Sequence, residues 1–224
     1  MAKAQKPPVA VPTRADLTRE RILAAAEVVF AQHGLNGTRV RAIADAAGVN
    51  VATLYLYFPS KSDLHEAVLE RGVRPLMELM TEFAASPRGV DAGERLLGAV
   101  MHHLGHHPSL PRLVYLEAIS EGAYVSKLAR RWLRPLLGAA VGQLKYTAAA
   151  TQWDERFFPL IVAAFLHLSF GHFALAPLFE EVFDGDPTAP EWIERQTAFL
   201  NTLVERMFNG TDGKGRARRR RPRK

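Results

Sequence analysis

The segment Met101–His107 holds the densest group of potential metal ligands in the chain. Within it, His102 and His106 stand four residues apart, and so do His103 and His107, a spacing that can chelate a metal on one face of a helix. A glycine inside the segment and a proline directly after it weaken such a helix, and no carboxylate joins either pair nearby. We therefore expect these histidines at the surface or between helices and predict no metal site and no cofactor. A metal-binding pair is the alternative.

Catalytic chemistry has little support in the residue types. The chain has no cysteine, which excludes disulfides, thiolate ligands and cysteine nucleophiles and fits a reducing cytoplasm. It also lacks a G-x-S-x-G turn, a glycine-rich phosphate loop and an H-E-x-x-H pair. The prediction is a cytoplasmic protein that is not an enzyme, with an enzyme on a helical scaffold as the weaker alternative.

Most of the net positive charge lies at the end of the chain. The formal charge is +6, but residues 214–224 carry eight bases and no acid, which leaves 21 bases against 23 acids elsewhere. A solvated basic tail attracts phosphates without reading sequence. A nonspecific nucleic-acid-binding protein driven by this tail is therefore one candidate.

A pattern for specific DNA binding lies nearer the N-terminus. Two short helical stretches, Val40–Ala47 and Val51–Phe58, are joined by a tight turn. Ala44 is small enough for the two helices to pack closely, Gly48 can make the turn and end the first helix, and Val49 can plug the corner. These are the demands of a helix-turn-helix, whose second helix places its outer face in the major groove of DNA.

A longer helix precedes this pair and must support it. Its apolar residues recur every four positions, and either Asp16 or Thr18 can cap its start. Apolar positions of the three helices together predict a shared core. The residues expected there are Ile22, Phe30, Ile43, Leu54 and Phe58.

Capping residues and a proline set the expected limits of the next elements. Asn50 can cap the second helix of the pair, and Ser60 or Ser62 can cap the helix that follows. Because proline lacks a backbone N–H and its ring clashes with the preceding turn, we expect Pro75 to kink or end that helix.

Runs of residues in a fixed order across this region resemble the TetR family of regulators. They are T-R-E-R-I-L-A-A-A from Thr18, F-A-Q-H-G from Phe30, I-A-D-A-A-G-V from Ile43, T-L-Y-L-Y-F from Thr53 and S-K from Ser60, within residues 14–70. The resemblance implies an all-α fold, with an N-terminal three-helix helix-turn-helix DNA-binding domain followed by a helical ligand-binding and dimerisation domain. The expected division is a flexible arm at 1–15, the DNA-binding domain at 16–62, the ligand-binding and dimerisation domain at 63–210, and a disordered basic tail at 211–224.

The resemblance also implies a set of DNA contacts. Arg41 matches a base-reading position, and arginine suits the O6 and N7 atoms of guanine. Val51 departs from the usual polar or small residue and could contact only a thymine methyl, while Leu56 stands at an often polar position and is left out. Lys61 and its helix N-terminus can hold a phosphate. The predicted contacts are Thr38, Arg39, Arg41, Val51, Ala52, Thr53, Tyr55, Tyr57 and Lys61.

The rest of the chain is expected to be an apolar helical bundle, with helices near 91–105, 109–119, 123–148, 154–183 and 191–208, where Pro135 could split the third. The resemblance implies that this bundle binds a small apolar or aromatic effector. The candidate lining residues are Tyr115, Trp132, Leu136, Phe165, His167, Phe170 and His172.

The segment 154–183 and the last helix are the expected dimer interface. The stretch Phe157–Phe179 has no charged residue and is long enough to span a membrane, but its prolines, histidines and small residues favour a buried interface helix, so no membrane is predicted. A homodimer would present two recognition helices about 34 Å apart to a palindromic operator in double-stranded DNA. The family-level expectation is a repressor that an effector releases from DNA, and the alternative is a family member that activates transcription or has a protein partner as its effector.

Overall fold

The computed structural model describes residues 12–85, 90–120, 125–145 and 153–208, and these residues form helices and no strand. The all-α prediction is thereby confirmed. The chain divides into two compact units between Arg71 and Gly72, rather than after residue 62 as the sequence suggested. The expected basic tail lies outside the described residues, as does most of the expected N-terminal arm.

Helix α1 (Arg14–Gly37) begins earlier than either predicted cap would allow. Thr13 is the N-cap, since its hydroxyl accepts a hydrogen bond from the Asp16 backbone N–H at 3.2 Å and the Asp16 carboxylate accepts one from the Thr13 N–H at 2.9 Å. This reciprocal pair satisfies two backbone donors that a cap at Asp16 or Thr18 would leave open. The last residues of the predicted arm therefore belong to the helix.

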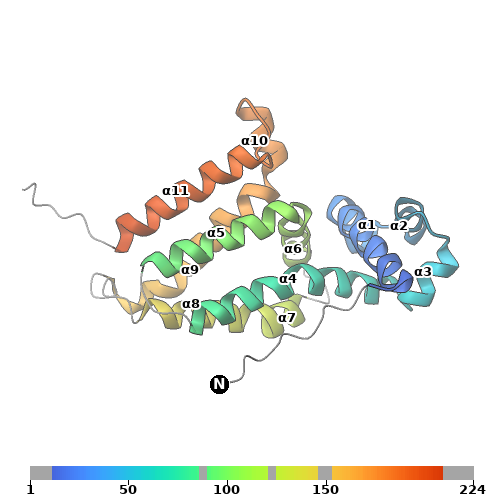
Figure 1. Cartoon of the computed structure of the whole chain (residues 1–224), viewed down its shortest axis with the longest axis horizontal. Helices are drawn as coiled ribbons and strands as arrows, with labels where there is room; N and C mark the ends of the chain where they lie inside the picture. Colours follow the sequence, from blue (N-terminus) through green and yellow to red (C-terminus); the bar gives the residue numbers. More distant parts are fainter. Residues whose placement is uncertain (1–11, 86–89, 121–124, 146–152, 209–224) are drawn as a thin grey trace, which may run out of the picture. The chain divides into compact units, whose positions relative to one another are not determined.

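Helices α2 (Val40–Ala47) and α3 (Val51–Tyr57) form the predicted helix-turn-helix pair, seen beside α1 in Figure 1. Gly48 ends α2 with φ of +64°, a left-handed conformation that favours glycine. The Asn50 side chain caps α3 by accepting a hydrogen bond from the Thr53 N–H at 2.6 Å. Both predicted roles are confirmed.

The first unit has a continuous apolar core built from α1, α2, α3 and the start of the next helix. Every residue predicted for this core is at most 4% exposed. Full burial of an aliphatic or aromatic side chain contributes about 1.5–3 kcal/mol. The buried apolar residues are Ile22, Leu23, Ala26, Phe30, Ala31, Ile43, Ala44, Ala47, Leu54, Phe58, Leu64, Val68 and Leu69.

Helix α4 (Lys61–Ala85) is one continuous helix that contributes residues to both units. Ser60 precedes it and accepts a hydrogen bond from the Asp63 N–H at 3.0 Å, as a cap does. Pro75 was predicted to kink or end the helix, and the second alternative is wrong, because α4 continues for ten residues beyond it. Burial of Leu76 and Met80 after the proline offsets the one backbone hydrogen bond that proline cannot make.

The second unit contains the remaining helices, and two predicted long helices are each divided at a proline. Pro135 follows a π-helical segment (Ala129–Leu133), and Pro177 lies in the first turn of a separate helix. The elements are α5 (Val90–His106), α6 (Ser109–Ile119), α7 (Val125–Leu128), η1 (Ala129–Leu133), α8 (Arg134–Leu144), η3 (Glu155–Phe157), α9 (Phe158–Ala174), α10 (Ala176–Val182) and α11 (Pro190–Phe208).

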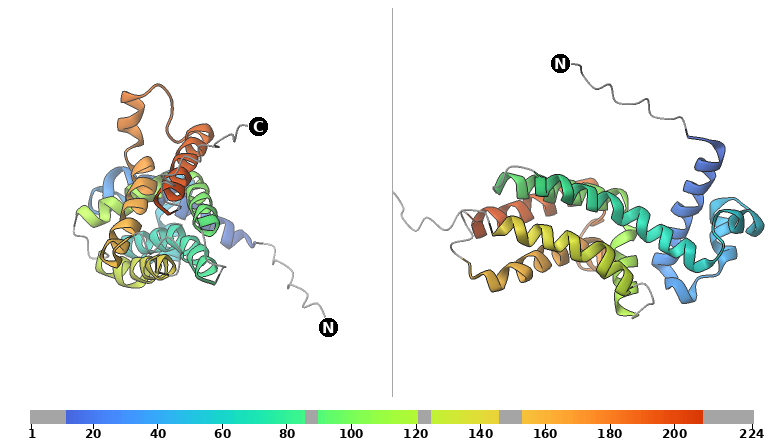
Figure 2. Two further views of the ribbon diagram at one scale, coloured as in Figure 1. Left: turned by 90° about the vertical axis from the view of Figure 1, so that its left-hand side faces the viewer. Right: turned by 90° about the horizontal axis from the view of Figure 1, so that it is seen from below.

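Helix α9 is the centre of this unit, since it packs against α5, α6, α8 and α11. In Figures 1 and 2, α5, α9 and α11 run beside one another, whereas α10 and the loop after it project away from the bundle. The segment Glu155–Ala174 is long and apolar enough to cross a membrane by length and composition, with a mean hydropathy of 1.7. About a third of this window is buried within the unit, where α9 packs against four other helices, so burial in the core accounts for only part of its apolar composition.

Candidate functional site

The outer face of α3 is defined by the one side chain that anchors it. Leu54 is fully buried, and because successive residues of a helix are rotated by about 100°, Ala52 and Leu56 lie on the opposite side. Leu56 is 85% exposed, the highest value among the large apolar side chains of the described residues. The centre of the outer face is therefore apolar, and a thymine methyl is the base feature that such a surface can contact.

Hydroxyl-bearing side chains lie on either flank of this apolar centre. Tyr55 is 44% exposed, whereas Thr53 and Tyr57 are half-buried. Val51, at the start of the same helix, has no hydroxyl and is also half-buried. Flanking hydroxyls on a helix in the major groove are suited to phosphate oxygens along the two walls of the groove. The structure thus brings five of the predicted contacts together on one short helix.

The start of α2 adds two exposed cations to the same unit. Arg39 is the N-cap of α2 and Arg41 lies in its first turn, both with solvent-exposed side chains. Thr38 differs from them: it is 4% exposed, and its hydroxyl donates to the Gly34 carbonyl at 2.7 Å. That hydroxyl is already bonded at the kinked end of α1, so Thr38 could contact a phosphate only through its backbone N–H.

Lys61 connects the start of α4 to the turn before α2. Its ammonium donates to the Thr38 carbonyl at 3.0 Å, an interaction between residues 23 positions apart in the chain. An ammonium has three N–H donors, so one bond to a carbonyl leaves two for a phosphate. Lys61 can therefore both position the turn and contact the DNA backbone.

His65 is a buried base in the core of this unit. It is 1% exposed and meets the Phe30 ring edge-on, with the ring centroids 4.9 Å apart. Burial, followed by the neighbouring positive charge of Lys61, lowers the pKa of His65 from 6.5 to about 4. The neutral imidazole is therefore the form that the folded unit accommodates.

This pKa predicts acid sensitivity of the first unit. Between pH 6.5 and 4 the unfolded chain binds a proton at His65 that the folded chain does not. The free energy of unfolding therefore has its full value above pH 6.5 and falls by about 3 kcal/mol as the pH drops through this window. The measurement is the melting temperature against pH by circular dichroism. His65→Leu should flatten the slope, whereas His106→Gln, at an exposed histidine, should not. If the melting temperature of His65→Leu depended on pH as steeply as that of the parent protein, His65 would not be the source of the acid sensitivity.

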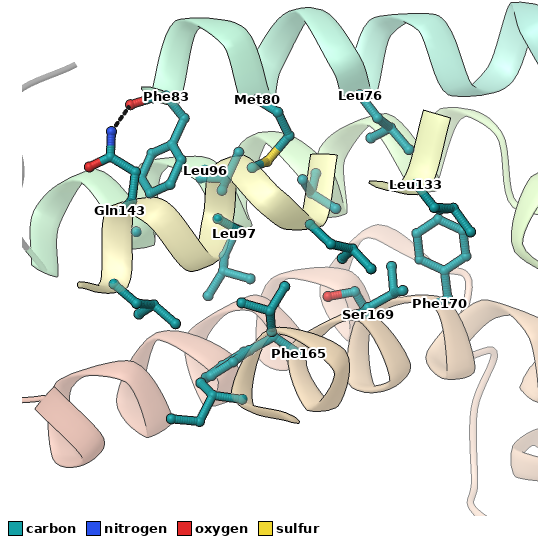
Figure 3. Close-up of a pocket in the computed structure, with 18 of the residues that line it drawn as sticks. Leu76, Met80, Phe83, Leu96, Leu97, Leu133, Gln143, Phe165, Ser169 and Phe170 are labelled. Carbon is teal, nitrogen blue, oxygen red and sulfur yellow. Dashed lines mark hydrogen bonds between the residues drawn. The ribbon is translucent and has the colours of Figure 1, made fainter. Parts of the chain in front are cut away.

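A largely apolar cavity of about 180 Å³ lies in the second unit, and Figure 3 shows most of its wall. It is partly open to solvent, and its wall is formed by residues from α4, α5, α8, α9 and neighbouring elements. The lining consists of Val73, Leu76, Met80, Phe83, Gly93, Leu96, Leu97, Val100, Val114, Leu133, Leu137, Ala140, Gln143, Leu144, Ile161, Val162, Phe165, Leu166, Ser169, Phe170 and Val204.

The predicted ligand-binding residues do not all line this cavity. Phe165 and Phe170 line the cavity. Tyr115 instead shares a hydrogen bond with Nδ1 of His167 at 3.2 Å, and burial raises the pKa of its phenol. His167 and His172 line a separate groove, where Nε2 of His172 lies 2.7 Å from the Pro187 carbonyl. The side chains of the other two candidates, Trp132 and Leu136, lie outside those that the structure describes.

Reasoning from sequence missed the small and amide residues of the cavity. Ser169 and Gln143 are its polar lining residues, and neither was a candidate. The sequence did hold a signal for Ser169, because it is a serine in an otherwise apolar helix and directly precedes Phe170. Both residues are buried, and Ser169 is 2% exposed. Leu56 was likewise set aside, and its exposure is what singles it out.

The histidine segment makes structural contacts. Nε2 of His103 lies 2.8 Å from the Gly72 carbonyl, and Nδ1 of His106 lies 2.9 Å from the His102 carbonyl. The described residues contain no group of three or more side chains positioned to hold a metal ion. These contacts tie α5 to α4 and to its own preceding turn.

Two family models match the chain. Residues 22–68 match the model described as bacterial regulatory proteins, tetR family. Residues 90–204 match the model described as tetracyclin repressor-like, C-terminal domain. The first match covers the helix-turn-helix unit, and the second, which covers half the chain, includes most of the cavity wall.

Curated proteins and solved structures are similar to the chain over different lengths. The HTH-type transcriptional repressor NicS of Pseudomonas putida is 31% identical over 62% of this chain and 65% of its own length. The repressor SCO4008 of Streptomyces coelicolor is 30% identical over 48% of this chain and 53% of its own length. The chain thus spans between half and two thirds of these relatives. The structure of the ketosteroid transcriptional regulator KstR2 of Mycobacterium tuberculosis shares the fold, with a TM-score of 0.67 and 20% identity over 87% of this chain and 94% of that one.

Proposed function

Because the chain belongs to the TetR family of bacterial regulatory proteins, we propose that it is a cytoplasmic transcriptional repressor that binds a palindromic operator as a homodimer. A small apolar effector in the second unit releases it from DNA. The observation that carries the proposal is the outward face of α3, where exposed Ala52 and Leu56 stand between hydroxyl-bearing neighbours on a helix anchored by buried Leu54.

Selection of random duplex DNA by the full chain at physiological salt tests this function. A two-fold reader enriches a palindromic motif whose half-sites are about one helical turn apart. Thymines at the positions nearest the centre of α3 would agree with its apolar outer face. Enrichment of no motif, with binding that disappears as salt rises, would overturn the proposal.

The same experiment separates the main competing function. A nonspecific binder driven by the tail would lose its DNA affinity when residues 214–224 are deleted. A specific repressor without that tail keeps its motif and loses mainly the salt-sensitive background. The relatives named above are regulators, so an enzyme on this scaffold has no support from them.

Exposed apolar side chains of the second unit support the homodimer. Leu160 and Leu168 of α9, Leu178 and Val182 of α10, and Phe199 of α11 are between 38% and 63% exposed. Several large apolar side chains exposed on helices that contact one another are typical of association sites. The exposed groove lined by His167 and His172 belongs to the same three helices and the loop before α11.

A charge on this surface should separate the protomers. The double variant Leu168→Arg/Phe199→Arg is expected to weaken dimerisation at least about 100-fold, since each new guanidinium would be desolvated in an apolar interface. Sedimentation velocity measures the change. Leu17→Arg, at a 54% exposed leucine of the first unit, is the matched control and should leave the dimer intact. A double variant that sediments like the parent protein would place the interface elsewhere.

The cavity supports release by a ligand. Its wall includes Val73, Leu76 and Met80 of α4, the same helix whose first residues, from Lys61, belong to the DNA-binding unit. A ligand that binds better to the DNA-free arrangement than to the DNA-bound one weakens operator affinity by the ratio of its two affinities.

A further inference from the structure

None of the described residues that line the cavity of the second unit has an ionisable side chain. Nineteen of its lining residues are apolar or glycine, and the two polar ones are Gln143 and Ser169. Moving a carboxylate or an ammonium from water into such surroundings without a partner carries a large desolvation cost. A ligand whose charged group would lie against this wall is therefore disfavoured.

Gln143 is already engaged in the protein's own structure. Its side-chain amide nitrogen donates to the Phe83 carbonyl at 3.1 Å and to the Ala84 carbonyl at 2.9 Å, and Figure 3 shows the first of these bonds. These carbonyls belong to the last turn of α4, where backbone acceptors lack partners within the helix. Both amide protons are thus used to cap α4 and to hold α8 beside it.

Among the described lining residues, Ser169 is the side chain with a hydrogen-bond donor left for a ligand, while Gln143 keeps only its Oε1 as an acceptor. The residue is 2% exposed, its hydroxyl lines the cavity, and no described residue forms a hydrogen bond with that hydroxyl. In Figure 3 it lies on α9 among Phe165, Phe170 and the leucines of the facing helices. A hydroxyl that faces the cavity without a partner among the described residues can form a hydrogen bond with a ligand that supplies one.

We propose that the ligand of this cavity is a neutral, apolar molecule of about one substituted aromatic ring that carries a single hydroxyl or carbonyl group held by Ser169. The inference rests on the proposed function only in treating this cavity as the effector site. An apolar cavity of about 150 Å³ accommodates benzene, so a volume of about 180 Å³ leaves room for a small substituent. The polar substituent fixes the orientation of the ligand, because Ser169 is the one described lining side chain that can still donate a hydrogen bond.

Three probes of the same ring size test the proposal by direct binding to the full-length protein without DNA. They are p-cresol, which is neutral and carries a hydroxyl, toluene, which lacks one, and 4-methylbenzoate, which is an anion at neutral pH. Calorimetry should give p-cresol about tenfold tighter binding than toluene, and 4-methylbenzoate at least about 100-fold weaker binding than p-cresol.

Two variants and one control test whether the preference for p-cresol arises from the Ser169 hydroxyl and whether the probes bind in the cavity. Ser169→Ala should bring p-cresol and toluene to nearly equal affinity while toluene binds as before, and Ser120→Ala, at the exposed serine that follows α6, should change nothing. Ala140→Phe should abolish binding of both neutral probes by filling the cavity. Circular dichroism melts establish that each variant is folded.

The outcomes are distinct from those of the proposed function. Binding of 4-methylbenzoate as tight as that of p-cresol, an unchanged cresol-to-toluene ratio in Ser169→Ala, or no binding of any probe would overturn the ligand class. Release of the selected DNA motif is measured separately by fluorescence anisotropy. Probes that bind as described but leave the DNA complex intact would contradict ligand-induced release while the ligand class stands.

Discussion

Replacement of Leu56 by glutamate is expected to lower the affinity for the selected DNA motif about 100-fold. Leu56 is 85% exposed at the centre of the outer face of α3. A carboxylate there would lose an apolar contact with a thymine methyl and would face the negative potential of the groove, together worth about 3 kcal/mol. Fluorescence anisotropy titrations at one fixed salt concentration measure the affinity.

Matched substitutions separate lost contact from repulsion. Leu56→Ala removes only the apolar contact and should cost about tenfold, mainly at the thymine positions of the motif. Because the side chain is exposed, both variants should melt within a few degrees of the parent protein. If Leu56→Glu bound the motif as tightly as the parent protein does, α3 could not read DNA through this face.

Replacement of Arg71 by alanine is expected to destabilise the first unit by about 3 kcal/mol. Its guanidinium lies 3.1 Å from the Glu27 carboxylate, whose side chain is 6% exposed, and 3.4 Å from Glu20. Removing one partner of a buried ion pair leaves a charge in surroundings that solvate it poorly, which is costlier than losing a surface pair. Urea denaturation followed by circular dichroism gives the free energy of unfolding.

An exposed arginine of the same unit provides the control. Arg19 lies 3.8 Å from Glu20 with both side chains about half exposed, so Arg19→Ala should cost less than about 1 kcal/mol. The double variant Arg71→Met/Glu27→Gln should recover much of the loss, since it removes the buried charge together with its partner. Equal losses in the Arg71 and Arg19 variants would show that burial does not amplify the Arg71 pair.

Local chemistry made the first unit predictable. Gly48 ends α2 and Asn50 caps α3 because each role depends on one residue type at one backbone position. The predicted core residues are buried for a related reason, since a repeat of apolar side chains about every four residues can bury only one face of a helix. The start of α1 was misplaced because three nearby residues can all cap, and only the observed bonds select Thr13.

Prediction was weaker where residues distant in sequence decide the outcome. Pro75 is a strong local signal for a helix end, yet α4 continues because apolar side chains on both sides of the proline are buried in the second unit. The cavity likewise depends on packing. Phe165 and Phe170 attract attention as aromatic residues, but Ser169 acquires its environment from helices that α9 meets only in the folded chain.

The amino-acid sequence by itself determined the helical class, the helix-turn-helix and most of its caps, because these follow from backbone preferences and apolar spacing within a few residues. Only the tertiary structure decided which side chains can contact DNA or a ligand. Leu56 faces outward because Leu54 is held in the core, the Thr38 hydroxyl is used because α1 kinks at Gly34, and Ser169 faces a cavity because α5 and α8 close over it. Such outcomes depend on contacts between distant segments, and a local pattern does not encode them.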